Sequence, residues 1–222
     1  MSKKILIVVT NVDSLANEAN GTYLPELTHA LSVLLNHGYD YDIISPKGGK
    51  APHYGGDDKG DEKTQILLQD AKFVESLNNT LTLNDIKAED YSAVFYPGGY
   101  GLLFDLVEDQ TIADISTTIY EAGGVISAVC HGPAALHSIT LSDGSSILKG
   151  KQVTGFTREE EVAMNTLDKV PFLVEEKLLE KAASYSKVAT WGVNVIQDGR
   201  VITGQNPSSA HAVGEALVKL MD

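Results

Sequence analysis

The only cysteine in the sequence, Cys130, is the residue best suited to nucleophilic chemistry. An apolar run over residues 125–129 leads into it, Ala128 precedes it by two positions and Gly132 follows it by two. This pattern is typical of the sharp strand-to-helix turn that projects a nucleophile from an α/β sheet. At such a turn the helix dipole favours the thiolate, and a fall of the thiol pKa from ~8.5 to about 6 would raise the thiolate fraction roughly 30-fold. We therefore predict a reactive thiol at Cys130, rather than the inert buried cysteine of many cores.

A second glycine-containing turn is expected at the same edge of the sheet. Gly98 and Gly99 follow an apolar segment at residues 93–96. Because parallel strands end at one edge of a sheet, the backbone N–H groups of these glycines can face the same crevice as Cys130. Together with the amide of His131 they would form an oxyanion hole, in which each donor contributes about 3–4 kcal/mol. A plain turn without a role in chemistry is the alternative.

The elements that would position these residues alternate between apolar strands and amphipathic helices. We expect strands at residues 5–10, 41–45, 93–96, 125–129, 153, 188–190, 193–196 and 201–203. We expect helices from residue 24 to just before residue 38, over residues 66–77 and 109–122, from near residue 132, and from residues 206–207 onward, with Asn206 as the N-cap of the last helix. This alternation predicts an α/β fold with a mostly parallel sheet that helices cover on both faces.

The chain has 222 residues, of which 43% are hydrophobic, which is sufficient for one large domain over residues 1–222. Residues 46–64 are polar and rich in glycine and charge, so we expect an exposed insertion there. Four acidic residues lie within it: Asp57, Asp58, Asp61 and Glu62. Their spacing does not fit a calcium-binding loop, so a solvated loop is favoured over a metal site.

Composition excludes several classes of function. The net charge of −13 argues against nucleic acid and anionic membrane surfaces as partners. A single cysteine rules out an intrachain disulfide and zinc sites built from several thiolates. The apolar run at residues 5–9 is too short for a signal peptide or a membrane span, so we expect a cytoplasmic protein. No cofactor is implied, because the glycine-rich stretches lack phosphate-loop and dinucleotide-binding spacings.

Five segments carry a resemblance to a known family. They are residues 23–29, 97–99, 128–134, 153–157 and 203–209. In this order they resemble the ThiJ/PfpI superfamily, which has a class I glutamine amidotransferase-like fold, and the resemblance covers essentially the whole chain. The most similar branch is that of the glutathione-independent glyoxalase III enzymes and heat-shock chaperones. The resemblance implies a flavodoxin-like three-layer α/β/α sandwich with a mostly parallel central sheet.

The same resemblance assigns expected roles to individual residues. Cys130 would be the nucleophile and His131 the neighbouring catalytic histidine. Glu26 would be the acidic partner that reaches the thiol from the first βα unit. Glu161 would orient the histidine, with Glu160 as the near alternative.

Three further aromatic or imidazole side chains have open interpretations. Tyr100 stands where many relatives have histidine, and together with the Gly98–Gly99 turn it is expected to bind substrate through a hydrogen bond. His29 lies one turn after Glu26 and could either line the site or pack within the helix. Trp191 is expected in the core or at an interface rather than in the site.

The function implied by the resemblance is that of a glyoxalase III-type lyase (D-lactate dehydratase). It would convert methylglyoxal to lactate without glutathione, in defence against carbonyl or oxidative stress. The expected partners are a small aldehyde or 2-oxoaldehyde substrate and a second copy of the chain in a homodimer. The alternatives are a holdase chaperone or a cysteine-oxidation sensor, and less favoured are a cysteine peptidase and an amidotransferase-like hydrolase. The amidotransferase needs a distant His-x-Glu pair, which this sequence lacks.

Overall fold

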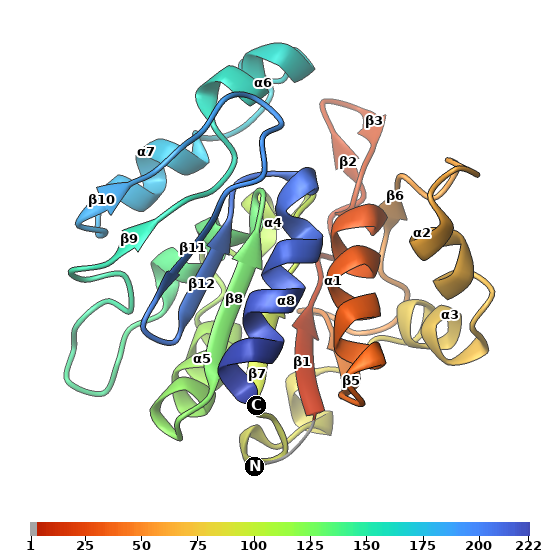
Figure 1. Cartoon of the computed structure of the whole chain (residues 1–222), viewed down its shortest axis with the longest axis horizontal. Coiled ribbons are helices and arrows are strands. Elements are labelled where there is room, and N and C mark those ends of the chain that lie inside the picture. The colour runs from red at the N-terminus through yellow and green to blue at the C-terminus, as the bar shows by residue number, and fades with distance from the viewer. Residues whose placement is uncertain (1–3) are drawn as a thin grey trace.

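Six strands form the central sheet of the computed structural model, which describes residues 4–222. Their order across the sheet is β11-β12-β8-β7-β1-β5, and every neighbouring pair is parallel except β11 and β12 (Figure 1). The apolar runs of the sequence become strands that are buried on both faces, as parallel sheets require. Their bounds are β1 (Lys4–Val8), β5 (Asp40–Ile44), β7 (Ala93–Tyr96), β8 (Val125–Val129), β11 (Val195–Asp198) and β12 (Val201–Gly204).

Helices cover both faces of this sheet, so the predicted fold class is confirmed. Helices α1 (Leu24–Asn36) and α8 (Ala210–Met221) pack side by side on one face, while α5 (Gln110–Glu121) lies on the other face (Figure 1). The apolar stripe of α1 that the sequence predicts is buried, and the helix ends before Gly38, which has a φ of 77°. The three layers follow from these two helical faces and the sheet between them.

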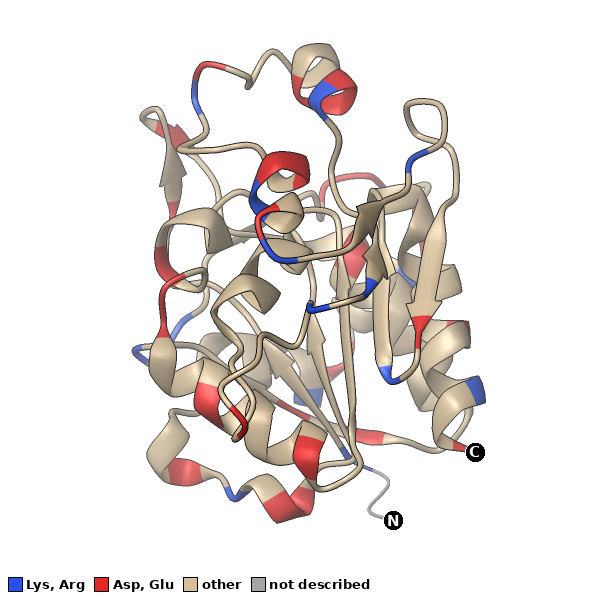
Figure 2. Cartoon of the chain, turned by 90° about the vertical axis from the view of Figure 1, so that its left-hand side faces the viewer, with Lys and Arg blue, Asp and Glu red and all other residues tan. Residues whose placement is uncertain are grey.

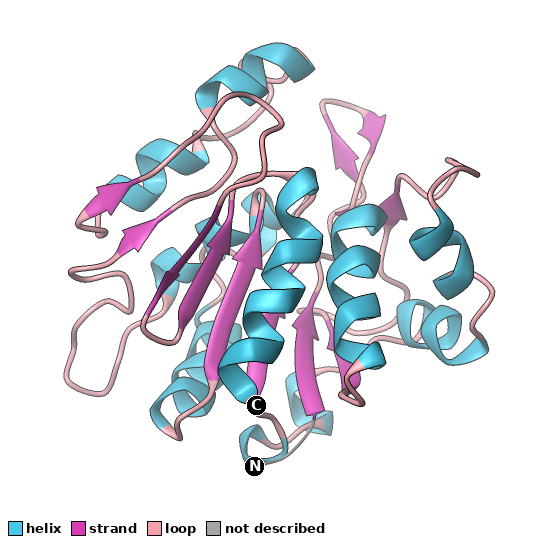
Figure 3. Ribbon diagram, viewed as in Figure 1, coloured by secondary structure: helices cyan, strands magenta, loops and turns pink. Residues whose placement is uncertain are grey.

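Shorter helices and strands lie around the central sheet and its covering helices (Figure 3). Three pairs of two-residue strands lie outside the central sheet: β2 (Ser14–Leu15) with β3 (Glu18–Ala19), β4 (Thr22–Tyr23) with β6 (His53–Tyr54), and β9 (Gln152–Val153) with β10 (Ser184–Tyr185). The remaining helices are α2 (Glu62–Leu67), α3 (Ala71–Asn78), α4 (Leu102–Asp105), α6 (Arg158–Met164) and α7 (Val174–Leu179). Short 3-10 segments are η1 (Leu83–Asp85), η2 (Ala88–Asp90), η3 (Gly132–Ser138) and η4 (Pro207–Ser209).

Several local predictions from the sequence are wrong. The helix expected over residues 66–77 is divided into α2 and α3, because the side chain of Asp70 accepts a hydrogen bond from the amide of Phe73 and starts a new helix. The helix expected after Cys130 is the 3-10 segment η3. Residues 188–190 form no strand, and the strand at residue 153 pairs with β10 outside the central sheet.

The last helix also starts differently from the prediction. Asn206 makes no side-chain capping bond, and α8 begins at Ala210 after the 3-10 segment η4. The amide group of Asn206 donates instead to the carboxylate of Glu160. The residue that the sequence suggested as a cap therefore holds a distant helix in place.

The segment at residues 46–64 is exposed only in part. Asp57 and Asp58 are exposed as predicted, but Ala51 is completely buried and β6 lies within the segment. Strand β6 pairs with β4, and the amide of Thr22 donates to the carbonyl oxygen of Pro52 at 2.9 Å. The segment is therefore packed against the start of α1 and contributes to the region above the sheet.

Acidic and basic residues are spread over the peripheral helices and loops (Figure 2). Within residues 4–222, none of the helices combines the length and the apolar character needed to cross a membrane.

Candidate active site

Cys130 lies at the carboxyl end of β8, in a turn whose backbone is tightly held. Its φ is 63°, in the left-handed region that non-glycine residues seldom adopt. The amide of Cys130 donates to the carbonyl oxygen of Gly204 at 2.9 Å, and its carbonyl oxygen accepts from the amide of Phe156 at 2.8 Å. A Cβ atom at Gly132 would stand 2.3 Å from the carbonyl oxygen of Tyr96, so only glycine fits there. The strained turn predicted from the sequence is therefore present, and it holds the thiol above the sheet.

A chain of hydrogen bonds runs from the thiol into the protein. The Sγ atom of Cys130 lies 3.2 Å from Nδ1 of His131, and Nε2 of the same ring lies 2.9 Å from Oε1 of Glu161. The hydroxyl of Thr166 donates to the second carboxyl oxygen of Glu161, and the hydroxyl of Tyr100 lies 3.0 Å from that of Thr166. Because a carboxylate accepts from Nε2–H, the neutral imidazole presents Nδ1 to the thiol as an acceptor.

Two aromatic rings fix the plane of the His131 imidazole. The ring of Tyr100 lies on one side with centroids 4.3 Å apart, and the ring of Phe156 lies 4.4 Å away. The hydroxyl of Tyr100, which was predicted to meet the substrate, lies within hydrogen-bond distance of the hydroxyl of Thr166. Tyr100 therefore positions His131 through ring contact and closes the hydrogen-bond chain at its far end.

The two adjacent glutamates have different partners, and this separates the two alternatives left open by the sequence. Glu161 contacts His131, whereas Glu160 does not. Oε1 of Glu160 accepts from the amide of Trp191 at 3.0 Å and from the side chains of Gln205 and Asn206 at 3.0 and 2.7 Å. Its Oε2 accepts from the amide and the hydroxyl of Thr157, both at 3.0 Å. Glu160 thus ties three segments together at the edge of the site.

This structural role of Glu160 was not predicted from the sequence. The signal that could have revealed it is the Thr-x-x-Glu spacing of Thr157 and Glu160, which is the pattern of a capping box at the start of a helix. The further donors, Gln205 and Asn206, lie far away in the sequence, and no local pattern predicts that they reach the same carboxylate.

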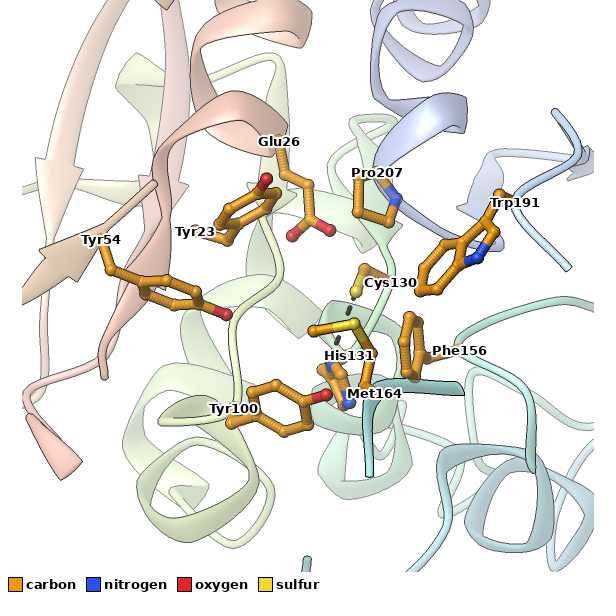
Figure 4. A pocket seen from close by; sticks show the side chains of 10 residues that line it. All are labelled: Tyr23, Glu26, Tyr54, Tyr100, Cys130, His131, Phe156, Met164, Trp191 and Pro207. Atoms are coloured by element: carbon orange, nitrogen blue, oxygen red, sulfur yellow. Dashed lines mark hydrogen bonds between the residues drawn. The ribbon is translucent and has the colours of Figure 1, made fainter. Parts of the chain in front are cut away.

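Glu26 approaches the thiol from the first turn of α1. Its carboxyl group points toward the sulfur of Cys130 (Figure 4) and is completely buried. A Cβ atom at Gly98 would stand 2.1 Å from Oε2 of Glu26 and 2.7 Å from Cβ of Cys130, so a glycine is required between them. Among residues 4–222, neither carboxyl oxygen of Glu26 has a hydrogen-bond partner of regular geometry. The thiol and the Gly98 amide are the polar groups that face it.

Burial dominates the electrostatics of this pair. Burial raises the pKa of Glu26 to about 8, and the facing thiol and Gly98 amide only partly oppose the rise. Burial first, and then the charge of Glu26, also raise the pKa of the Cys130 thiol, while the backbone amide of His131 opposes this. The expected lowering of the thiol pKa is therefore wrong, because loss of solvation outweighs the dipole of the short segment η3. The two groups titrate as a coupled pair that keeps its protons at neutral pH.

Cys130 opens into a cavity of about 300 Å³ with a largely aromatic wall (Figure 4). The residues that line it are Tyr23, Glu26, Tyr54, Tyr100, Cys130, His131, Phe156, Met164, Trp191 and Pro207. Trp191, which was expected in the core or at an interface, lines this cavity, is 41% exposed and has a φ of 65°. His29 does not line it. Its Nε2 lies 2.8 Å from Asp61, beside a neighbouring cavity.

The two glycines of the predicted oxyanion hole have different surroundings. Gly98 lies between Glu26 and Cys130, and the backbone amide of His131 faces the sulfur. Gly99, with a φ of 111°, packs against the backbone of residues 21–23, where an added Cβ atom would stand 2.2 Å from the carbonyl oxygen of Gly21. The amide of Gly98 therefore faces the carboxyl group of Glu26 and that of His131 faces the thiol, whereas Gly99 packs elsewhere.

No metal site is evident in the part of the chain that the structure describes, where no three potential ligand side chains gather suitably. Asp61, one of the four acidic residues of the 46–64 segment, accepts from the amide of Thr64 as the N-cap of α2 and pairs with His29. These contacts hold Asp61 at the start of α2.

This combination defines a class of α/β proteins in which a cysteine stands on a strained turn after a central strand, beside an imidazole and buried carboxyl groups. A model of the DJ-1/PfpI family matches residues 15–220. The chain therefore belongs to the DJ-1/PfpI family, which is the superfamily that its motifs resemble.

Relatives and solved structures agree with this assignment. The glutathione-independent glyoxalase HSP31 of Saccharomyces cerevisiae is 32% identical over 95% of this chain and 94% of its own length. The structure of the Rapid Encystment Protein 24 KDa of Francisella tularensis superposes with a TM-score of 0.94 at 33% identity, covering 100% of both chains. The structure of glyoxalase III from Candida albicans superposes with a TM-score of 0.89 at 26% identity, covering 99% of this chain and 97% of the other.

Proposed function

We propose that this protein is a glutathione-independent glyoxalase that converts methylglyoxal to lactate through a thioester at Cys130. The observation that carries the proposal is the position of Glu26. The carboxyl group of Glu26, which has no hydrogen-bond partner of regular geometry within the described part of the chain, faces the thiol from one side. His131 contacts the thiol from another side, within a cavity large enough for a 2-oxoaldehyde. Two relatives that align over 95% and 97% of this chain, one named as a glutathione-independent glyoxalase and the other as glyoxalase 3, support the same reaction.

The first step forms a hemithioacetal. The thiol of Cys130 transfers its proton to Nδ1 of His131, 3.2 Å away, and Glu161 balances the charge of the imidazolium. The sulfur bonds to the aldehyde carbon, C1, and the electron pair of the C1 carbonyl moves to its oxygen. Glu26, which is protonated below a pH of about 8, gives its proton to that oxygen. The amides of Gly98 and His131 stabilise the charge that develops there.

The next steps move a proton between the two carbons. The carboxylate of Glu26 removes the proton from C1, a C1–C2 double bond forms, and the C2 oxygen becomes negatively charged. Glu26 returns this proton to C2, and the hydroxyl proton on the C1 oxygen passes to the C2 oxygen, which leaves a lactoyl thioester. We assign the shuttle to Glu26 rather than to His131, because both ring nitrogens of His131 are already engaged.

Hydrolysis restores the site. Water adds to C1 and gives a proton to the carboxylate of Glu26, the C1–S bond breaks, and the sulfur recovers its proton from the imidazolium of His131. The product is lactic acid, which releases a proton to water as lactate, and each group of the protein returns to its starting protonation state. The sequence of steps needs no glutathione, since Cys130 supplies the thiol.

Replacement of the nucleophile tests the proposal. Wild-type protein without glutathione should consume methylglyoxal and release an equal amount of lactate, whereas Cys130→Ala should lower kcat/KM by at least ~10³-fold. Rapid quenching and mass spectrometry of the wild-type protein should detect Cys130 with the mass of one added methylglyoxal. Lactate formation that survives Cys130→Ala at the wild-type rate would remove the thiol from the mechanism.

A small carbonyl compound is the substrate that this reaction requires. The homodimer stays a prediction from the resemblance, and the single-domain organisation over residues 1–222 stays a prediction from length and composition. The chaperone and oxidation-sensor alternatives also stay predictions.

A further inference from the structure

Few polar side chains in the cavity are free to meet a substrate oxygen. Among the described lining residues, Tyr100 is engaged with Thr166, and both nitrogens of His131 are engaged with Cys130 and Glu161. The indole nitrogen of Trp191 points away from the sulfur in Figure 4. The remaining side-chain donors are Glu26, which serves C1, and two tyrosines.

The two tyrosine hydroxyls are not equivalent. In Figure 4 the hydroxyl of Tyr54 points into the cavity, toward the side occupied by Cys130 and His131. The hydroxyl of Tyr23 points away from the sulfur, and Tyr23 also lines the neighbouring cavity. Tyr54 makes no side-chain hydrogen bond to any other part of residues 4–222. Its hydroxyl is therefore the free donor on the wall opposite the thiol.

The backbone holds the Tyr54 ring in place. Strands β4 and β6 pair in parallel so that Tyr54 stands beside Tyr23, and their ring centroids lie 5.0 Å apart. Gly55, with a φ of 83°, lets the chain turn closely past the Tyr23 ring, because a Cβ atom there would stand 2.3 Å from the ring. The Tyr54 hydroxyl is thus presented by paired strands rather than by a free loop.

We propose that Tyr54 is a substrate-binding residue whose hydroxyl donates a hydrogen bond to the C2 oxygen of a 2-oxoaldehyde bound at Cys130. This inference rests on the proposed glyoxalase function and deepens it. The amides of Gly98 and His131 serve the oxygen on C1, next to the sulfur, so the second oxygen extends into the cavity. Negative charge develops on that oxygen when C1 loses its proton, and a hydrogen bond to it strengthens at that point.

The Tyr54 hydroxyl also keeps its proton over the working range of pH. Burial, followed by the nearby charges of Glu26 and Cys130, raises the pKa of Tyr54 far above its usual value. The side chain therefore acts as a donor of a hydrogen bond and does not titrate during the reaction.

Tyr54→Phe tests the inference, because it removes the hydroxyl and retains the ring that packs on Tyr23. The variant should lower kcat/KM for methylglyoxal by roughly 10–100-fold, with most of the loss in kcat. Alkylation of Cys130 by iodoacetamide should proceed at the wild-type rate, since the thiol and its partners are untouched. Tyr91→Phe is the control: the hydroxyl of Tyr91 donates to Asp42 in the edge strand β5, neither residue lines the cavity, and kcat/KM should stay unchanged.

A second readout does not depend on turnover. Methylglyoxal should protect Cys130 from iodoacetamide by forming the hemithioacetal, and Tyr54→Phe should need roughly tenfold more methylglyoxal for the same protection. Propanal, which lacks the second carbonyl oxygen, should protect both proteins equally. The role of Tyr54 would be overturned if Tyr54→Phe turned methylglyoxal over at the wild-type rate. It would also be overturned if the substitution weakened the protection by methylglyoxal and by propanal equally. Absence of lactate from the wild type would instead refute the glyoxalase function, and the protection assay would still decide the role of Tyr54.

Discussion

The first turn of α1 and the first turn of α6 each bury a glutamate completely, but the two carboxyl groups have opposite surroundings. Glu160, in α6, accepts hydrogen bonds from two backbone amides and three side chains. Glu26, in α1, has no hydrogen-bond partner of regular geometry among residues 4–222, and the thiol of Cys130 and the amide of Gly98 face its carboxyl group. Donors stabilise a buried charge, and their absence favours the neutral acid. Although the two side chains are equally buried, Glu160 therefore has a structural role in α6, whereas Glu26 in α1 can hold and transfer a proton.

Glu26→Gln gives the largest expected effect, because it removes the proton shuttle without changing the size of the side chain. We expect kcat to fall by roughly 10²–10⁴-fold. Wild-type activity should decline as the pH rises through about 8, where Glu26 loses the proton that the first step needs. Initial rates of lactate formation between pH 5 and about 9 measure both effects, with exposed Glu108→Gln as the control.

The same variant should change the dependence of stability on pH. The pKa of Glu26 is raised from 4.5 in the unfolded chain to about 8 in the folded protein, so the folded state binds the extra proton between these values. The free energy of unfolding of the wild type should therefore decrease as pH rises through this window. Glu26→Gln should lack this decrease in urea titrations. A parallel decrease in both proteins would show that Glu26 ionises normally and would remove the contrast with Glu160.

Glu160→Gln should affect stability more than chemistry. An amide nitrogen would face groups that are themselves donors, so buried hydrogen bonds are lost and the free energy of unfolding should fall by about 2–4 kcal/mol. Trp191, the sole tryptophan, is held by this carboxylate, and its fluorescence should shift as the loop is released. Glu159→Gln, at the adjacent and exposed position, is the control for urea unfolding. An unchanged midpoint for Glu160→Gln would mean that the donors around it contribute no net stability.

Thr166→Val should give the smallest effect. It tests Glu161, whose carboxyl group has more hydrogen-bond partners than that of Glu26 and fewer than that of Glu160. One oxygen of Glu161 meets His131 and the other accepts from Thr166. Valine keeps the shape of threonine but removes this donor, which should lower kcat by about tenfold while KM stays within roughly twofold. Steady-state kinetics with methylglyoxal measure this split. A rise in KM with kcat unchanged would place Thr166 in substrate binding instead of in the support of the histidine.

The elements that the sequence could predict are those with long local patterns. The apolar runs of β1, β7 and β8 and the stripe of α1 reveal strands and helices because burial on a sheet needs many apolar residues in a row. The small-x-Cys-x-Gly pattern likewise located the turn at Cys130, since close packing there depends on adjacent residues.

The features that escaped prediction depend on contacts between distant segments. The two-residue strands β4 and β6 are too short to show a period, so Tyr54 could not be recognised as part of the cavity. The choice between Glu160 and Glu161 required knowing where Asn206 and His131 lie in space. The direction of the thiol pKa was also missed, because the sequence suggests a helix dipole but does not report how completely the fold removes water.

The left-handed backbone at Cys130 bears on how a structure of the protein with bound substrate could be obtained. The direction in which the side chain leaves the turn is fixed by main-chain bonds to Gly204 and Phe156, which do not involve the sulfur. Alanine at position 130 should therefore keep the same direction of the Cα–Cβ bond, and the residues that line the cavity should keep their positions. Crystals of the Cys130→Ala variant that are soaked with methylglyoxal should then show the unreacted aldehyde bound in an inactive site whose geometry is unchanged.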